Sequence, residues 1–459
     1  MSSLTVFVHR LRSTSARRLT WILLAATVLG AALSVLAMQW CRVNGWSDPD
    51  QHLYMCYSDF SLLFTQRGLA EGNMPFFDSM PEEQMMEYPV LIALVAGALA
   101  ALVPEDLAAD DRILVFYDLN HALVILCWIG VVLVTAASAG RRRSDALLVA
   151  LAPGIILTLS VNWDMWAVFL GGLGLLLWGR SRPVWAGVLL GLGAAMKLYP
   201  LFFLGAILVL CVRAGRIRSF AAVTAAGVIT WLAVNVPFML MSFEQWSLFY
   251  TFSSEREVSF SSMWLAFVWT GWDGQTFSLL SNGIFLLCCL AIAYLGWAAP
   301  QRPRTAQLCF LIVASFLLLG KVYSPQFVMW LIPLVVLARP KVRGFLVWQA
   351  VEVFHWASVW LISAKINAEE LAGAGEQFFG SGHLLFEVLY GTGVIAHMAV
   401  LIWLMVQVVR EILHPELDAV GPDPLAGVLA GRTDRFTLPG LGAADQAQHG
   451  PERSRHLTW

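Results

Sequence analysis

Two acidic residues stand beside aromatic residues near the start of an otherwise apolar chain. Asp59 follows Tyr57 and Ser58, and Glu87 precedes Tyr88. A carboxylate in such a place can take a proton from a hydroxyl group as a general base. Asp59 can equally cap the amphipathic helix that the next residues predict, because the helix dipole stabilises a negative charge at that end. Glu87 can bind hydroxyl groups or pair with a lysine.

Two lysines are unusual because each ends an apolar segment in a similar motif. Lys197 begins the sequence Lys-Leu-Tyr-Pro, and Lys321 begins Lys-Val-Tyr-Ser-Pro-Gln. A single lysine in such a place commonly extends its ammonium group to the membrane interface. Two of them on one side favour an anion site, since ionisable groups within a membrane usually pair or bind something. The phosphate of a lipid head group is a suitable anion.

Two further segments offer polar or aromatic groups. Asn162 and Asp164 lie in a short turn with Trp163. They can hydrogen-bond the hydroxyl groups of a sugar, or they can cap the next helix. Residues 242–276 are dense in aromatic side chains and contain Arg256. An interfacial aromatic belt is the favoured interpretation of that loop, and a surface that holds an isoprenoid chain or stacks on sugar rings is the alternative.

The composition is that of an integral membrane protein. Of the 459 residues, 58% are hydrophobic and 13% are charged, and the mean hydropathy is +0.69. A soluble domain has about 45–50% apolar and about 25% charged residues. The apolar residues form blocks that approach the length of a membrane span. The net charge of −2 gives no indication of a nucleic-acid partner.

These blocks predict an all-α polytopic membrane protein with about twelve spans. Four arginines precede the first block. An uncleaved signal anchor is favoured over a signal peptide there, because the block is longer than an ordinary h-region and more spans follow. The predicted spans are residues 19–40, 113–137, 146–160, 165–178, 184–198, 201–212, 220–240, 277–298, 305–319, 327–337, 345–362 and 384–409.

The charges of the short loops predict the orientation. With the N-terminus inside and residues 90–103 forming a helix that does not cross, 22 of the 29 Lys and Arg residues lie inside, as the positive-inside rule requires. If that helix crossed, the bias would reverse. The loop 41–112 is therefore predicted to lie outside, with juxtamembrane helices and on the same side as the other motifs. Residues 1–18 and the tail 411–459 are predicted to be cytoplasmic, and the polar tail to be disordered; residues 19–410 form the transmembrane domain.

The cysteines and histidines show no metal-binding spacing. None of the seven cysteines belongs to a CxxC motif. Cys41 and Cys56 both fall on the predicted outer side and can pair, but their spacing does not decide it. The sequence thus predicts no metal site and no cofactor, and it leaves any need for a divalent ion open. The histidines without a ligand pattern are His52, His121, His355 and His397.

Taken together, the motifs resemble a known family. An early Ser-Asp pair at Asp59 and the motif that begins at Glu87 are followed by a glycine-rich helix that leads into the Lys197 motif, and then by the Lys321 motif. Their order and common side resemble the actinobacterial polyprenyl-phosphate-mannose-dependent glycosyltransferases of the GT-C superfamily. That group includes alpha-(1,2)-mannosyltransferases and related arabinofuranosyltransferases. The family often shows Tyr-Pro-Pro where Val90 here replaces the second proline.

The resemblance implies a GT-C-like fold and a donor in which a sugar is joined through phosphate to a polyprenol. It implies that Asp59 is the general base of an inverting transfer to a cell-envelope glycan or glycolipid. The reaction would take place at the outer face of the plasma membrane, among membrane lipids. The implied donor-site residues are Lys197, Tyr199, Lys321, Tyr323, Ser324 and Gln326, and the other candidate pocket residues are Glu87, Tyr88, Asn162, Asp164 and Arg256.

Three other interpretations stay open. An arabinofuranosyltransferase would differ only in the donor sugar. A transporter or lipid flippase often has inverted repeats and ionisable residues near the bilayer midplane, and the gathering of motifs on one face disfavours it. A non-catalytic scaffold of an envelope-synthesis complex is distinguished only by whether sugar transfer requires Asp59.

Overall fold

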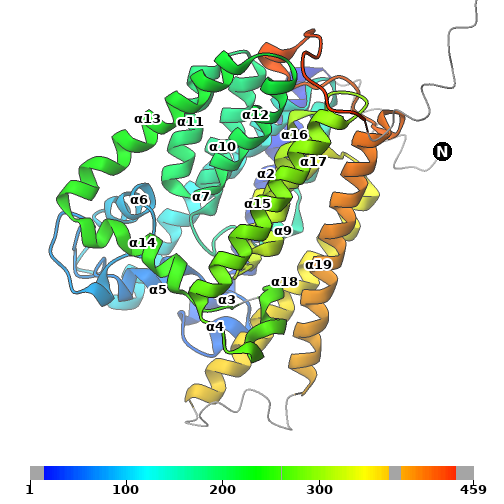
Figure 1. The fold of residues 1–459 in the computed structure, drawn as a ribbon. Helices are drawn as coiled ribbons and strands as arrows, with labels where there is room; N and C mark the ends of the chain where they lie inside the picture. Colours follow the sequence, from blue (N-terminus) through cyan, green and yellow to red (C-terminus); the bar gives the residue numbers. More distant parts are fainter. Residues whose placement is uncertain (1–14, 260, 372–383, 441–459) are drawn as a thin grey trace, which may run out of the picture.

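The computed structural model describes residues 15–259, 261–371 and 384–440, and every regular element in these ranges is a helix. Figure 1 shows long helices side by side, with the short helices α4 and α5 at the lower end of the bundle. Among the described residues, six helices are long and apolar enough to cross a membrane. They are α2 (Ala16–Ala37), α7 (Ala109–Ser138), α13 (Ile217–Met241), α15 (Gly274–Ala298), α18 (Val342–Leu371) and α19 (Leu384–Leu413).

Shorter apolar helices complete the bundle, and one of them, α6 (Val90–Ala100), lies at its edge (Figure 1). Every residue of α17 is buried, so protein surrounds it, and a helix in that position need not have the length of an upright span. The prediction of a polytopic all-α membrane protein is confirmed, whereas the count of twelve spans is not. The shorter helices are α6 (Val90–Ala100), α10 (Asp164–Gly179), α11 (Pro183–Met196), α12 (Phe202–Arg213), α16 (Thr305–Leu319) and α17 (Val328–Ala338).

The span predicted at residues 146–160 is broken. It consists of η2 (Gly140–Ala146), α8 (Leu147–Ala150) and α9 (Pro153–Thr158). Pro153 has no N–H and disfavours helical backbone in the residue before it. At the start of α9, the backbone N–H of Gly154 donates to the side-chain oxygen of Gln349 (2.9 Å). Tertiary contacts therefore satisfy the backbone where the helix stops.

The loop 41–112 folds into short helices at one end of the bundle. They are α3 (Gln39–Asn44), α4 (Asp50–Leu53), α5 (Asp59–Gln66), η1 (Glu82–Gln84) and α6. A disulfide joins Cys41 to Cys56, whose Cα atoms are 5.9 Å apart, which settles the pairing that the sequence left open. Helix α6 has 11 residues, too few for the roughly 20 of an upright span. Its length agrees with the prediction of a helix that does not cross.

Helices α11 and α13 touch through their backbones. An ideal Cβ on Gly187 would lie 2.2 Å from the carbonyl oxygen of Val223, and one on Gly191 would lie 2.4 Å from that of Gly227. Gly187 and Gly191 are four residues apart and thus share a helix face. Small residues with this spacing let membrane helices approach closely. Because Lys197 directly follows α11, the contact between α11 and α13 also fixes the position of the Lys197 backbone.

Residues 411–440 differ from the predicted disordered tail. They return to the end of the bundle opposite α5, where Figure 1 draws them in orange and red. Asp434 binds Arg213 (2.8 Å) and Arg302 (2.6 Å). The sequence did not indicate this order, because the segment has no periodic pattern of apolar residues. Ion pairs with arginines at the ends of helices and in loops hold it in place. Residues 1–14 and 441–459, also predicted to be cytoplasmic, lie outside the described residues.

A methyl group between α11 and α13 is expected to destabilise the fold. In Gly187→Ala the new Cβ meets a carbonyl oxygen at 2.2 Å, so the helices must separate. We expect a loss of about 1–3 kcal/mol, measured as a lower Tm of the protein in detergent. Gly172 of α10 is the matched control, since its Cβ would contact Val134 at an ordinary 3.5 Å. Gly172→Ala is expected to keep or raise the Tm; equal melting of Gly187→Ala and the wild type would contradict the backbone contact.

Candidate active site at the start of helix α5

Asp59 is the first residue of α5, and its backbone is fixed to the turn before α10. The hydroxyl of Ser58 accepts from the N–H of Phe60 (3.2 Å) and donates to the carbonyl oxygen of Ser160 (2.6 Å). The N–H of Asp59 donates to the carbonyl oxygen of Val161 (2.7 Å). Ser58 is therefore the N-cap, and the alternative in which Asp59 caps this helix does not hold. The carboxylate of Asp59 is free for other contacts.

Two tyrosine hydroxyl groups hold the carboxylate of Asp59. Tyr57 donates to Oδ1 (2.8 Å) and Tyr88 donates to Oδ2 (2.5 Å). The ring of Tyr57 lies 5.2 Å from that of Trp360, and the ring of Tyr88 lies 5.3 Å from that of Trp163. As a whole residue, Asp59 is half-buried.

The environment makes Asp59 more basic than an exposed aspartate. Burial raises its pKa, while the hydrogen bonds from Tyr88 and Tyr57 and the positive charge of Lys197 oppose that rise. Burial disfavours the charged form, and hydrogen bonds to the carboxylate favour it. The net shift is upward, which strengthens Asp59 as a proton acceptor.

Arg256 stands near this carboxylate without a carboxylate partner of its own in the described part of the chain. It follows α14 (Phe243–Glu255), is half-buried, and places its guanidinium carbon 5.7 Å from the centroid of the Phe252 ring. Burial lowers its pKa, and the charges of Asp59 and Glu87 are among the influences that oppose this. The guanidinium thus lies within electrostatic reach of both carboxylates and can still bind an anion.

Lys321 does not serve as a free cation. Its ammonium group donates to the backbone carbonyls of Ser254 (2.9 Å), Arg256 (2.6 Å) and Gly274 (3.0 Å). An ammonium group has three hydrogens, so these bonds use all of them. They fasten the C-terminal end of α14 to the start of α15, where a cation also suits the helix dipole. Lys321 therefore positions Arg256.

Lys197 is already neutralised. It pairs with Asp164 (2.8 Å), whose other oxygen accepts from the indole N–H of Trp330 (2.9 Å). Asp164 is completely buried. Asn162 accepts from the N–H of Asp164 (3.0 Å), but the N-cap of α10 is Trp163 and no side chain caps that helix. The amide of Asn162 reaches the hydroxyl of Tyr88 (3.5 Å). Lys197 contributes to the site through its ammonium group, 4.9 Å from the centroid of the Tyr88 ring.

Glu87 pairs with an arginine, not with a lysine. Nε of Arg67 binds its Oε2 (2.7 Å) and Nη2 binds its Oε1 (3.0 Å). Paired hydrogen bonds of this kind fix geometry as well as charge. Arg67 ends α5 and Glu87 precedes α6. The pair therefore holds the segment with Tyr88 against the helix that begins at Asp59.

The remaining predicted donor residues lie apart from the carboxylate of Asp59. Tyr199 stacks on Trp330, with ring centroids 4.4 Å apart. Tyr323 lies against Glu352, its hydroxyl 3.5 Å from the carboxylate. Ser324 and Gln326 both precede α17. In the described ranges no hydrogen bond joins either side chain to Asp59 and the two tyrosines that hold it, a group called here the Asp59 cluster. The two lysine motifs thus place their tyrosines against different partners although they look alike in sequence.

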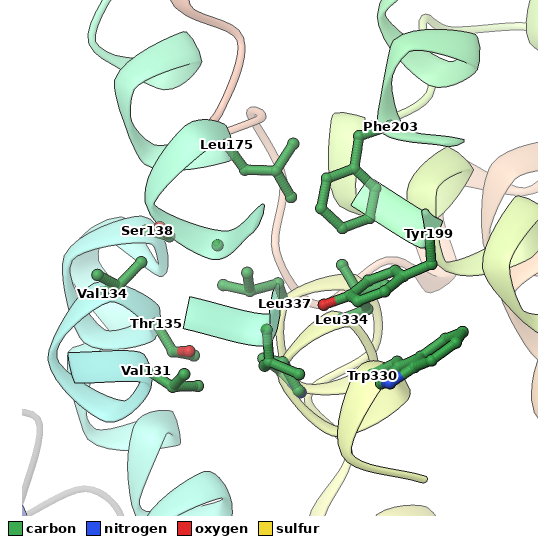
Figure 2. A pocket seen from close by; sticks show the side chains of 13 residues that line it. Val131, Val134, Thr135, Ser138, Leu175, Tyr199, Phe203, Trp330, Leu334 and Leu337 are labelled. Atoms are coloured by element: carbon green, nitrogen blue, oxygen red, sulfur yellow. The ribbon is translucent and has the colours of Figure 1, made fainter. Parts of the chain in front are cut away.

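A small apolar pocket adjoins this network. Figure 2 shows Tyr199 and Trp330 on one side and Val131 and Thr135 of α7 on the other. Because Trp330 also binds Asp164, the pocket and the polar network share a wall. The lining is almost wholly apolar, and it lacks the convergent polar groups that orient a polar ligand. The Asp59 cluster is therefore the better candidate site.

The fold and this site describe a polytopic membrane protein with a carboxylate site at one end of its bundle. The family model described as glycosyltransferase family 87 matches residues 87–320, about half of the chain. The chain belongs to glycosyltransferase family 87 and is a membrane glycosyltransferase. The match includes Glu87, Lys197 and Arg256, whereas Asp59 lies before it. A search of curated proteins finds no match.

Three contributors to the site were missed as site residues. Tyr57 could have been found, because Ser58 has extended backbone (φ −148°, ψ 130°) and side chains two residues apart in extended chain point the same way. The pairing of Arg67 with Glu87 could have been weighed from their opposite charges. No local signal marks Trp330, since only the packing of α17 on α10 brings it to Asp164.

Loss of the Lys197 charge is expected to destabilise the protein. Lys197→Met leaves the completely buried carboxylate of Asp164 without a cation, which costs about 3–5 kcal/mol. The Tm in detergent should fall accordingly. Adding Asp164→Asn to the same chain removes the buried charge and should restore most of the loss. If Lys197→Met alone melts like the wild type, the ion pair does not stabilise this end of α10.

Proposed function

We propose that this glycosyltransferase moves mannose from a polyprenyl-phosphate donor to a hydroxyl group of a cell-envelope glycan or glycolipid, with Asp59 as general base. One observation carries the proposal. The Asp59 carboxylate does not cap the helix and is held between the hydroxyls of Tyr57 and Tyr88. The charge of Asp59 acts on Arg256, whose guanidinium has no ion pair among the described residues. A base and an anion-binding group are thus placed together.

The proposed reaction is a single displacement. Asp59 takes the proton of the acceptor hydroxyl as its oxygen forms a bond to the anomeric carbon of the donor. The bond between that carbon and the phosphate oxygen breaks, and polyprenyl phosphate leaves with the electron pair. Attack from the opposite face inverts the anomeric centre. Arg256 suits the departing phosphate, because a guanidinium offers paired donors to an oxyanion and stabilises charge that develops there.

The surroundings of Arg256 favour a donor with a lipid tail. Helix α14 and the following η4 (Met263–Thr270) are rich in aromatic residues. Phe243, Trp269 and Trp272 are exposed by 63%, 82% and 44% of their surfaces. Aromatic side chains of this kind lie at the level of lipid head groups, where the phosphate of a membrane-embedded polyprenol also lies. Aromatic residues at the level of the lipid head groups do not distinguish between donor sugars, so arabinofuranose is the second candidate for transfer.

We place the site on the extracytoplasmic side of the plasma membrane. The disulfide between Cys41 and Cys56 lies in the loop that leads to Asp59, and disulfides persist in oxidising compartments. The opposite end of the bundle holds the arginines that bind the tail, such as Arg213 and Arg302. An excess of arginine favours the cytoplasmic side.

The first test is Asp59→Asn, which preserves size and removes the base. With polyprenyl-phosphate-mannose and an envelope glycolipid acceptor, we expect the transfer rate to fall by about 10²–10⁴-fold, while the Tm shows a folded protein. Glu82→Gln is the matched control, because Glu82 is an exposed carboxylate in the same loop. Full activity of Asp59→Asn contradicts the role of base. If the wild type transfers sugar from the arabinose donor and not from the mannose donor, Asp59 keeps its proposed role as base and the transferred sugar is arabinofuranose.

The second test is the pH dependence of transfer in Tyr88→Phe. The hydrogen bond from Tyr88 lowers the pKa of Asp59, so its loss should raise that pKa. A base loses activity as pH falls through its pKa, and the acid limb of kcat/KM should therefore move to higher pH. Tyr294→Phe, at an exposed tyrosine of α15, should leave the limb in place. An unmoved limb in Tyr88→Phe would show that another group limits the rate.

A further inference from the structure

A second polar cluster lies away from Asp59, and the proposed transfer does not use it. Glu352 and His355 of α18 and His397 of α19 place one ligand atom each within 4.8 Å of one another. Their exposed fractions are 3%, 0% and 1%. The sequence did not indicate the cluster, because Glu352 and His397 are 45 positions apart. The spacing of the histidines predicts no metal site.

We propose that Glu352, His355 and His397 bind one divalent transition-metal ion, for which Zn²⁺ is the best fit. Two imidazoles and one carboxylate are a ligand set that Zn²⁺ accepts, with a fourth position left for another ligand. Hard cations such as Mg²⁺ and Ca²⁺ instead prefer oxygen atoms. Glu352 and His355 are three residues apart on one helix and thus project from one face.

The spacing of the donor atoms suits such an ion. Nδ1 of His397 lies 2.8 Å from Oε1 of Glu352, and Nδ1 of His355 lies 3.9 Å from Oε2 of Glu352. Zinc bonds of about 2.0–2.2 Å in a tetrahedron place neighbouring ligand atoms about 3.3 Å apart. The two observed distances lie on either side of that value. Small rotations of the side chains would bring all three atoms onto one ion.

His355 is already oriented as a metal ligand. Its Nε2 is hydrogen-bonded to the hydroxyl of Ser261 (2.5 Å), which leaves Nδ1 on the side of Glu352. This Nδ1 is buried and has no hydrogen-bond partner among the described residues. Metal-bound histidines usually have their other nitrogen held in this way. The unpartnered Nδ1 is the observation that most directly indicates a missing ligand.

The charge of Glu352 points to the same conclusion. Within the described ranges its carboxylate meets no lysine or arginine. It accepts from the indole of Trp348 (2.8 Å), and the hydroxyl of Tyr323 lies 3.5 Å away. The groups nearest to it that could carry a positive charge are the imidazoles of His397 and His355, which do so only when protonated. A carboxylate buried within a membrane helix needs a compensating positive charge. A divalent ion supplies it, and the hydroxyl of Tyr323 or a water can take the fourth position.

The ion would have a positioning role. It would join α18 to α19 in the middle of both helices. Through His355 it would hold Ser261, which lies in the segment that follows α14 and Arg256. Helix α18 also carries Trp360, which contacts Tyr57. Ion binding would thus stiffen two supports of the Asp59 site without contact with the reacting atoms.

Metal content tests the proposal directly. The full chain is purified in detergent through a tag without histidine, with no chelator, and its zinc is measured by mass spectrometry. We expect about one zinc per chain, and at least a tenfold loss in His355→Ala and in His397→Ala. His414→Ala is the matched control and should keep the zinc, since the His414 side chain is 60% exposed. Zinc retained by both cluster variants would overturn the proposal.

A second measurement does not depend on the folding of variants. Wild-type protein is stripped with a chelator and then given Zn²⁺ or Co²⁺ alone. Zn²⁺ should raise the Tm, because an ion that binds only the folded state stabilises it, and Co²⁺ should give the visible absorption of a tetrahedral site. Neither signal requires sugar transfer, so failure here is separate from failure of the proposed function. Wild-type protein that shows neither signal and holds no zinc as purified contradicts the site.

Discussion

The stabilisation of the half-buried Asp59 by hydrogen bonds and positive charge is the constraint around which this end of the bundle is organised. Burial of a carboxylate costs free energy unless hydrogen bonds and opposite charge offset it. Tyr57 and Tyr88 supply the hydrogen bonds, and Lys197 supplies positive charge through space. Each of these groups comes from a different part of the chain. The short helices of the loop 41–112 and the ends of α11 and α14 thus all carry groups that act on this carboxylate.

The distribution of positive charge in the site decides which residues can bind a ligand. Lys197 and Lys321 carry similar motifs, yet a carboxylate neutralises one of them and three carbonyl groups surround the other. Neither ammonium group is left for a phosphate. Arg256 belongs to no motif, and among the described residues its guanidinium makes no side-chain hydrogen bond or ion pair that would prevent it from binding an anion. The proposed donor site therefore rests on Arg256, with Lys321 as the residue that positions it.

The sequence predicted what local patterns determine. Apolar blocks identify a polytopic helical membrane protein, and the loop charges predict that residues 90–103 form a helix that does not cross. The break before Pro153 and the ordered segment 411–440 were missed, because each depends on contacts with distant residues. In the site, the capping alternative for Asp59 could not be excluded until Ser58 was seen to cap the helix. The proximity of Glu352 to His397 likewise depends on how α18 packs against α19.

A structure of the protein with a non-transferable polyprenyl-phosphate-sugar analogue bound is the most direct test of the account. We expect a phosphate oxygen to lie within hydrogen-bond distance, about 3 Å, of the Arg256 guanidinium. We also expect the anomeric carbon to face the Asp59 carboxylate, with space between them for an acceptor hydroxyl. A phosphate bound away from Arg256, with the sugar out of reach of Asp59, would contradict the account.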